Sequence, residues 1–373
     1  MIYLDYSANT PASPGVLERF CEVERSCPGN ANSRHQAGRE AKLVIDHATQ
    51  NIAGLLGAQP AEVIYTSGAS EANNFALKGL AKLSRHAGRH IISTPLEHSS
   101  VSGTLTALQE QGYEIDLVDI RRDGTIDLGH LKELLRPDTI AVAVTLVDSE
   151  LGVVQPVKEI LELLQAWPNC HLHVDATQAV GKVPVSFEGV DTMSLTAHKF
   201  YGLNGIGLLL KRRKLALEPL IHGGESTTIY RSGTPTVAAS LETALEAAVG
   251  ELPARTARVK EANAFLRDAL SKYPKVHINS PENAIPHILN LSVENVKGTV
   301  FQRELDAEGV CVSVKSACSS DGLPSRAVFA VSRDRRNALS SWRISLSHLT
   351  TQEELNGFLH AFDACYTRLT RPQ

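Results

Sequence analysis

Four short segments of this 373-residue chain hold side chains whose types and spacing could do chemistry. In the first, an apolar run ending at Thr66 leads into Ser67-Gly68-Ala69-Ser70 and then into a helical pattern. The first amides of a helix lack partners and favour negative charge, so this turn could bind a phosphate. A strand-to-helix turn needs Gly and Ser in any case, so a purely structural interpretation explains the segment equally well. The turn matches neither a Walker A loop nor Gly-x-Gly-x-x-Gly, which argues against nucleoside triphosphates and dinucleotides.

Two further segments place a charged side chain directly after an apolar strand pattern. Asp175 ends the run Leu172–Asp175, at the strand edge where parallel sheets bind ligands. A buried carboxylate there needs a partner, although the N-cap of a following helix would also explain it. Lys199 follows the run Thr192–Thr196 beside His198 and precedes a Gly-rich turn. A lone lysine is usually solvated, whereas a desolvated lysine suits Schiff-base chemistry.

The fourth segment holds a cysteine, Cys318, in the polar stretch Ser316–Gly322 that follows an apolar run. A lone cysteine is usually a small buried hydrophobe. Polar surroundings, with Lys315 three residues earlier, favour an exposed and reactive thiol instead. Neighbouring residues of a strand face opposite sides, so Cys170, His171 and His173 are not expected to form a metal site. The other cysteines are interpreted as inert: Cys21, Cys27, Cys170, Cys311 and Cys365.

Composition limits the kind of protein that positions these side chains. Hydrophobic residues make up 43% and charged residues 21% of the chain, which is ordinary for a globular protein and excludes disordered and coiled-coil classes. Lys and Arg number 37 against 41 Asp and Glu, a net charge of −4, so neither direct nucleic-acid binding nor membrane attraction is expected. The N-terminus lacks the features of a secretory signal, and the longest apolar stretch, Ile140–Val147, is far below the ~20 residues that span a bilayer. Six scattered cysteines indicate free thiols in a reducing compartment, so we expect a cytoplasmic protein.

Hydrophobic patterning divides the chain into two expected domains. Residues 15–252 alternate short β-branched runs with helical stretches, which predicts a parallel sheet covered by helices. Residues 253–373, together with 1–14, are expected to form a smaller α+β domain that carries the cysteine loop. The strands expected in the larger domain are Glu62–Thr66, Arg89–Ser93, Ile115–Asp119, Ile140–Leu146, Leu172–Asp175, Thr192–Thr196 and Gly207–Lys211.

The smaller domain is predicted from five further patterns and a final helix. A charged helical pattern covers Arg255–Leu270, and a terminal helix is expected from Thr351. The charge-rich Ser332–Arg336 is interpreted as a solvated loop rather than a binding patch. The remaining expected elements are strands at His287–Val293, Val310–Val314 and Trp342–Ser347 and a helix near Thr299–Glu308.

A phosphate site, a strand-end acid and a strand-end lysine are together the three fixtures of a pyridoxal phosphate (PLP) enzyme. With these residues in place, the chain resembles the class V aminotransferase family, and within it the cysteine desulfurases of the NifS/IscS type. The resemblance runs from Tyr3-Leu4-Asp5 to Leu346. It implies the α/β fold type I of PLP-dependent transferases, with a mainly parallel seven-stranded sheet flanked by helices and a smaller α+β domain. The matching motifs are Tyr65-Thr66-Ser67-Gly68-Ala69-Ser70-Glu71, Glu97-His98, His173-Val174-Asp175-Ala176-Thr177-Gln178, His198-Lys199 and Arg231-Ser232-Gly233-Thr234.

The resemblance also implies a role for each matching residue. Lys199 would bond covalently to the cofactor, Asp175 would pair with the pyridine nitrogen, and His98 would stack on the ring and move protons. Ala69, Ser70, Thr196 and His198 would bind the phosphate, with Gln178 near the ring hydroxyl. Thr234 would reach the phosphate of the neighbouring subunit, which implies a homodimer with shared active sites. Arg343, assisted by Asn30, would bind the substrate carboxylate, which a guanidinium can do through two hydrogen bonds.

The implied reaction converts L-cysteine to L-alanine and leaves the sulfur on Cys318 as a persulfide. An acceptor protein would then take the sulfur for iron–sulfur assembly, tRNA thiolation or DNA phosphorothioation. Two alternatives remain open at this stage. One is another class V PLP enzyme, such as a selenocysteine lyase, cysteine lyase or epimerase, and the other is a degenerate scaffold subunit of a sulfur-transfer complex.

The chain departs from the family pattern at three places. Asp148-Ser149-Glu150-Leu151-Gly152 stands where the family has Asn-Asn-Glu-Ile/Thr-Gly, whose first Asn normally donates to the cofactor's ring oxygen. An ionised Asp148 could not donate and would repel a phenolate there. Gly223-Gly224-Glu225-Ser226-Thr227 and Ala8-Asn9-Thr10 also differ from the usual sequences, so a divergent branch is expected.

Overall fold

The structure is a computed structural model that describes residues 1–222, 234–315 and 323–371. Its larger part is built on a seven-stranded sheet with the order β2-β8-β7-β6-β5-β3-β4. β8 runs antiparallel to both of its neighbours, and the other pairings are parallel. This confirms the predicted mainly parallel α/β fold. The strands are β2 (Val63–Thr66), β3 (His90–Ser93), β4 (Glu114–Leu117), β5 (Thr139–Thr145), β6 (His171–Asp175), β7 (Thr192–Thr196) and β8 (Gly207–Lys211).

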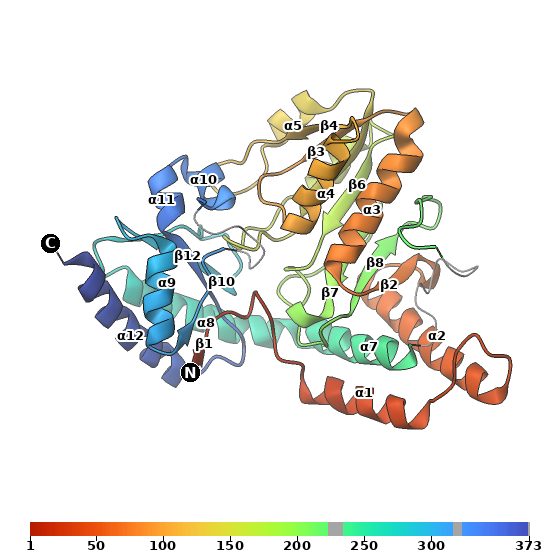
Figure 1. The fold of residues 1–373 in the computed structure, drawn as a ribbon, viewed down its shortest axis with the longest axis horizontal. Coiled ribbons are helices and arrows are strands. Elements are labelled where there is room, and N and C mark those ends of the chain that lie inside the picture. The colour runs from red at the N-terminus through yellow and green to blue at the C-terminus, as the bar shows by residue number, and fades with distance from the viewer. Residues whose placement is uncertain (223–233, 316–322, 372–373) are drawn as a thin grey trace.

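Helices cover both faces of this sheet, as buried parallel strands require (Figure 1). Alternate side chains of β2 point to opposite faces of the sheet. Ile64 packs with Phe75 of α3 on one face, and Val63 and Tyr65 pack in the core formed with α2 on the other. α7 packs against both α1 and α2. The helices of this part are α1 (Pro14–Ser26), α2 (Gln36–Leu56), α3 (Ala69–Leu83), α4 (Ser99–Gln109), α5 (Leu128–Leu134), α6 (Val157–Leu164) and α7 (Pro235–Gly250).

A second, smaller core forms the left side of Figure 1. Its antiparallel sheet has the order β12-β10-β9, and β1 pairs in parallel with β11. Trp342 stacks on Phe301 with ring centroids 5.1 Å apart and lies next to Phe362, so aromatic side chains fill the centre of this core. Its elements are β1 (Ile2–Tyr3), α8 (Leu252–Leu270), β9 (Val276–Ile278), β10 (Ile288–Val293), α9 (Gly298–Ala307), β11 (Val310–Cys311), β12 (Ser341–Ser345) and α12 (Gln352–Thr370).

The structure differs from the sequence-based expectations in a few elements. Residues 176–191, between β6 and β7, form turns rather than a helix, so the carboxylate of Asp175 caps a turn through the N–H of Thr177. The expected loop at Ser332–Arg336 is a corner between two short helices, α10 (Arg326–Ser332) and α11 (Arg335–Ser340), and the Asp334 side chain caps the second. Ala327, Val328 and Ala338 of these helices pack with the core of the larger sheet. The domain division at 15–252 and 253–373 stays a prediction.

The N-terminal segment, residues 2–10, connects the two cores. β1 belongs to the smaller core, and the N–H of Ser7 donates to Ser345 Oγ of β12. Three residues later, the N–H of Thr10 donates to the carbonyl of His198, which follows β7 of the large sheet. The segment therefore passes directly between the elements that carry Arg343 and Lys199.

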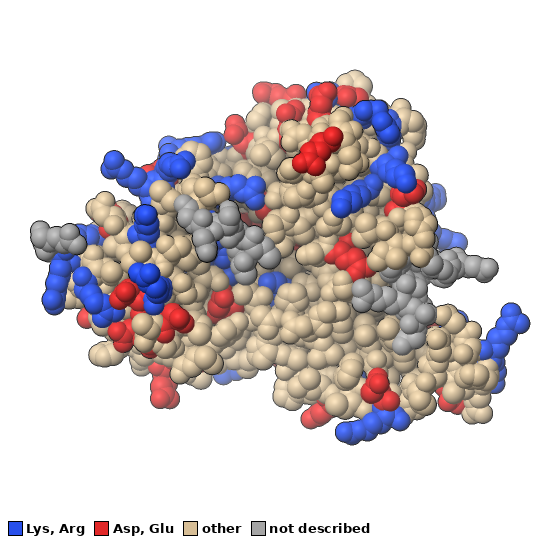
Figure 2. Space-filling view, viewed as in Figure 1, with Lys and Arg blue, Asp and Glu red and all other residues tan. Residues whose placement is uncertain are grey.

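Two surface properties bear on the kind of partner the chain meets. On the face drawn in Figure 2, acidic and basic side chains are interspersed. None of the helices in the described parts of the chain is both long enough and apolar enough to cross a membrane.

Candidate active site

A cavity of about 350 Å³ opens where the carboxyl ends of β5, β6 and β7 meet the N-terminus of α3. Parallel α/β proteins place their ligands at this edge, and the volume is in the range of small-molecule sites. The cavity brings together predicted residues from distant parts of the chain: Ala69, Ser70, His98, Asp175, Gln178, Thr196, His198, Lys199 and Arg343. It is also lined by residues to which the sequence analysis assigned no role: Ser7, Ala8, Leu96, Thr145, Ser149 and Thr177.

One end of the cavity is suited to an anion. Ala69 and Ser70 begin α3, whose first amides have no partners within the helix. Gly68 precedes them with φ +153°, and a Cβ on the neighbouring Gly207 would lie 2.6 Å from the Gly68 Cα. The turn therefore needs glycine at both positions, because β8 passes directly against it. Amides, hydroxyls and an imidazole thus surround a space that fits a phosphate.

A buried carboxylate lies on the floor of the cavity, at the end of β6. Asp175 Oδ2 accepts a hydrogen bond from Asn73 Nδ2 at 2.8 Å, and Oδ1 accepts from the N–H of Thr177 at 2.9 Å. Asn73 Oδ1 in turn lies 3.0 Å from His173 Nε2 and accepts from Ser194 Oγ. Burial lowers the pKa of His173 to about 4, so this imidazole is neutral and acts as a hydrogen-bonding spacer. The network fixes the orientation of Asp175, and Asn73 lies on the buried face of α3.

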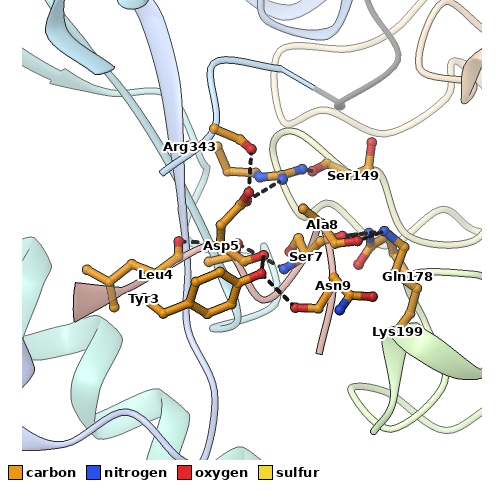
Figure 3. A network of polar contacts seen from close by, with 12 residues as sticks. Tyr3, Leu4, Asp5, Ser7, Ala8, Asn9, Ser149, Gln178, Lys199 and Arg343 are labelled. Atoms are coloured by element: carbon orange, nitrogen blue, oxygen red, sulfur yellow. Dashed lines mark hydrogen bonds and ion pairs between the residues drawn. The ribbon is translucent and has the colours of Figure 1, made fainter. Parts of the chain in front are cut away.

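The amine of Lys199 is held by backbone carbonyls of the N-terminal segment. Its Nζ donates to the carbonyl oxygens of Ser7 and Ala8, each at 2.7 Å. Gln178 Nε2 donates to the same Ser7 oxygen at 2.8 Å, so the two side chains converge there (Figure 3). The sequence could not indicate these partners, because a backbone carbonyl carries no residue-type signal.

His98 is the N-cap of α4 and faces the cavity. Its Nδ1 accepts from the N–H of Ser100 at 3.2 Å, which leaves Nε2 as the protonated nitrogen of the neutral ring. Burial lowers the pKa of His98 and the charge of Lys199 lowers it further, while Asp175 opposes them. The neutral form with Nε2–H is therefore the resting state.

The side chain of Glu97, the residue before His98, is buried. Its Oε1 accepts from Thr94 Oγ1 at 2.7 Å and from the N–H of Thr145 at 2.9 Å. Burial raises the pKa of Glu97 to about 8, so this carboxyl is protonated at neutral pH.

Arg343 of β12 lines the cavity from the side of the smaller core, and the residue is 1% exposed. Its Nη2 lies 3.0 Å from Asp5 Oδ1, and its Nη1 donates to the carbonyl of Ser149 at 2.6 Å (Figure 3). Asp5 also accepts from Ser313 Oγ at 2.7 Å. The Nε–H of Arg343 is buried and has no hydrogen-bond partner among the described residues. The two contacts hold the guanidinium in place and leave further N–H groups on its terminal nitrogens, so Arg343 is suited to bind a carboxylate in the cavity.

Four predicted residues are not among those that line the cavity. Asp148 is buried, and its Oδ2 accepts from the N–H of Leu151 within its own turn. Burial and the charge of Glu150 raise the pKa of Asp148 to about 7, and Ser149 rather than Asp148 lines the cavity. Asn30 is exposed, and its side chain accepts from the N–H of Asn32. Thr234 precedes α7, and Cys318 lies outside the described residues.

Three of the remaining cysteines have surroundings unlike those of a reactive thiol. Burial raises the pKa of Cys170 to about 12 and also raises those of Cys311 and Cys365. Cys21 and Cys27 lie on or near the surface of α1 and its C-cap. Within the described parts of the chain, three or more His, Cys, Asp or Glu side chains do not gather into a metal-binding group.

The fold and this cavity define an α/β protein whose site suits a small phosphorylated ligand. Comparison with known proteins identifies the family, because the aminotransferase class-V family model matches residues 2–358. The chain is 36% identical over 375 residues to a cysteine desulfurase IscS of Dictyoglomus turgidum, covering 99% of this chain and 95% of that protein. This chain belongs to the aminotransferase class-V family.

Solved structures agree with this assignment. A NifS-like protein superposes with a TM-score of 0.90 and 32% identity, covering 99% of both chains. SspA in complex with cysteine superposes with a TM-score of 0.82 and 29% identity, covering 94% of this chain and 100% of that one. The sequence-based resemblance to class V aminotransferases and NifS/IscS proteins is thus confirmed.

Proposed function

We propose that this chain is a PLP-dependent cysteine desulfurase that converts L-cysteine to L-alanine and carries the sulfur on Cys318. The observation that supports it most is one cavity in which Lys199, Asp175, the α3 turn and Arg343 meet. The Dictyoglomus relative named a cysteine desulfurase and the SspA structure with cysteine support the substrate.

The described residues fit the cofactor at each of its polar groups. Ala69, Ser70, Thr196 and His198 would hold the phosphate, and Asp175 would hold the pyridine nitrogen protonated. Lys199 would supply the amine that bonds to the cofactor's aldehyde carbon, and Gln178 would lie near the ring hydroxyl. Bound there, the cofactor would withdraw electrons from the substrate carbon that bears the amine.

Arg343 and His98 would act on the substrate. The N–H groups that remain on the two terminal nitrogens of Arg343 would receive the substrate carboxylate, and Asn30 would assist from its loop. His98 would stack on the ring and move protons, as a base in its neutral form and as an acid once it has taken up a proton.

Cys318 would receive the sulfur. Its thiolate attacks the sulfur of bound L-cysteine, an S–S bond forms, and the Cβ–S bond breaks with its electron pair on the carbon side. A proton then completes L-alanine. The carbon skeleton is reduced and the transferred sulfur is oxidised to the persulfide level, so the reaction needs no external oxidant or reductant.

The test measures alanine formed per cysteine consumed and traps the persulfide by alkylation and mass spectrometry. Wild-type protein should form alanine and a persulfide on Cys318, whereas Cys318→Ala should form neither above background. Cys170→Ala, which removes a buried thiol, serves as the matched control and should keep both. Sulfide release from cysteine by Cys318→Ala at the wild-type rate would refute the assignment of Cys318.

The proposed assembly is a homodimer in which Thr234 reaches the partner's phosphate site. Thr234 is not among the residues that line the cavity of its own chain, which is consistent with this role. Heterodimers of Thr234→Ala and Lys199→Ala chains would regain one intact site, and restored alanine formation on mixing would support a shared site.

We further propose a cytoplasmic location and a protein acceptor for iron–sulfur assembly, tRNA thiolation or DNA phosphorothioation.

A further inference from the structure

Lys182, in the turns between β6 and β7, is a buried cation that the proposed reaction does not use. It is 9% exposed, and within the described part of the chain its amine makes two hydrogen bonds and no ion pair. Lysine is rarely buried without a carboxylate partner, because desolvating its charge is costly. Such a group calls for a reason other than stability.

The two hydrogen bonds of Lys182 both reach the cavity wall. Nζ donates to Gln178 Oε1 at 3.1 Å and to the carbonyl oxygen of Lys199 at 3.3 Å. Lys182 therefore connects the side chain of Gln178, which is expected near the cofactor ring, to the backbone of Lys199, which is expected to bond to the cofactor.

The side-chain amide of Gln178 is fixed at both ends by this contact. Its Nε2 donates to the carbonyl of Ser7, which can only accept, and its Oε1, which can also only accept, receives a hydrogen bond from Nζ of Lys182. One N–H of Nε2 remains for a cavity ligand. The arrangement presents a donor to the cavity and turns the amide oxygen away from it.

We propose that Lys182 is a positioning residue for the cofactor, bracing the Gln178 amide and the Lys199 backbone and keeping a positive charge beside the ring-oxygen end of the site. This inference rests on the proposed PLP-dependent function. A nearby positive charge disfavours an additional proton on the bound cofactor, and a well-placed donor stabilises its ring oxygen as an anion. Loss of Lys182 removes both effects, and both losses raise the pH at which the bound cofactor gives up its proton.

The titratable groups around the site decide where in the pH range this effect is seen. Burial, with the charges of Lys199 and Arg343, lowers the pKa of Lys182 itself to about 7, so Lys182 acts by its charge at the acidic end of the range and by its hydrogen bond to Gln178 throughout. Burial lowers the pKa of His198 to about 4 and that of His287 to about 3, and both stay neutral in the titration range. A small cavity next to Lys182 is lined by four other titratable or charged side chains: Tyr6, Tyr201, Arg255 and His348. Burial lowers the pKa of His348 to about 4 and raises the pKa of both tyrosines.

The experiment compares Lys182→Met with Lys211→Met in protein loaded with PLP. Lys211 is a matched control, because its amine also donates to two carbonyl oxygens, here the backbone carbonyls of Leu215 and Arg212. Burial lowers its pKa too, but it does not line the cavity. The visible absorbance band of the bound cofactor is titrated from about pH 6 to 9. Lys182→Met should raise the midpoint by about one pH unit, the size that one nearby charge gives, and Lys211→Met should leave it unchanged.

A double-variant cycle with Gln178→Leu tests whether Lys182 acts through that side chain. The combined shift should be smaller than the sum of the single shifts, because the two residues share one contact. An unchanged midpoint in Lys182→Met, or fully additive shifts, would overturn the inference. Should Lys182→Met fail to fold or to hold PLP, Lys182→Gln keeps a donor without the charge and should shift the midpoint in the same direction. Absence of any PLP band in the wild-type protein would instead refute the proposed function.

Discussion

Breaking the Asp5–Arg343 pair is expected to destabilise the smaller core much more than breaking an ion pair on the surface. The side chains of the pair are 16% and 2% exposed, and Asp5→Asn keeps the shape while leaving the guanidinium without its counter-charge. Removing one partner of a buried pair costs about 3–5 kcal/mol. Because Asp5 is partly exposed, the lower end of that range, about 3 kcal/mol, is expected for the free energy of unfolding.

A double-mutant cycle separates the pair from the individual side chains. Asp5→Asn, Arg343→Met and the double variant are unfolded in urea at one protein concentration, and the coupling energy is taken from the three differences. Trp342 adjoins Arg343 and lies inside the smaller core, so its fluorescence reports on this region. The chain has two tryptophans, so Trp167→Phe leaves Trp342 as the reporter.

The control is an exposed pair of similar length. Lys42 Nζ lies 2.9 Å from Asp46 Oδ1, and both side chains are more than half exposed. Its coupling energy should be about 0.3–0.5 kcal/mol, against about 2–3 kcal/mol for Asp5 and Arg343. Equal coupling in the two pairs would refute the argument that Arg343 depends on Asp5 for its charge balance. In addition, propionate should stabilise Asp5→Asn more than wild type, because a bound carboxylate would replace the lost charge.

Three further changes test the cavity wall. The pKa of Glu97 is raised to about 8 in the folded state, whereas the unfolded chain releases this proton near pH 4.5. The free energy of unfolding should therefore fall as pH rises from about 5 to 8. Glu97→Gln should flatten this pH dependence, measured by urea unfolding at several pH values. Gly207→Ala should lower stability by about 2 kcal/mol or more and weaken PLP retention, since its Cβ would meet backbone at 2.6 Å, whereas Gly250→Ala, with open space around it, should not. Asn73→Leu should cost about 3 kcal/mol and loosen PLP, measured by equilibrium dialysis, because Asp175 and its neighbours lose their shared partner; unchanged retention in Asn73→Leu would argue against the network as the support of Asp175.

Several strands of the large sheet were predictable because they are short, nearly continuous apolar runs, as in β5 and β8, whereas β4 is half polar and exposed at both ends. β1, with two residues, and the half-exposed β9 are too short or too polar to give such a pattern. The cavity was predictable only where function depends on residue type, as at Lys199 and Asp175. Partners that act through backbone atoms, such as Ser7 and Ala8, leave no signal in one sequence.

Asp148 shows why spacing alone does not place a side chain. The family pattern suggested that this carboxylate faces the ring oxygen of the cofactor, where its charge would repel a phenolate. In the structure the carboxylate turns back to the N–H of Leu151, and the next residue, Ser149, faces the cavity and offers its carbonyl to Arg343. The turn is closed by a hydrogen bond from the N–H of Gly152 to the carbonyl of Asp148, and within it one residue lines the cavity while its neighbour is buried, so a shift of one position exchanges the two environments. The charge at Asp148 therefore bears on the stability of the 148–152 turn.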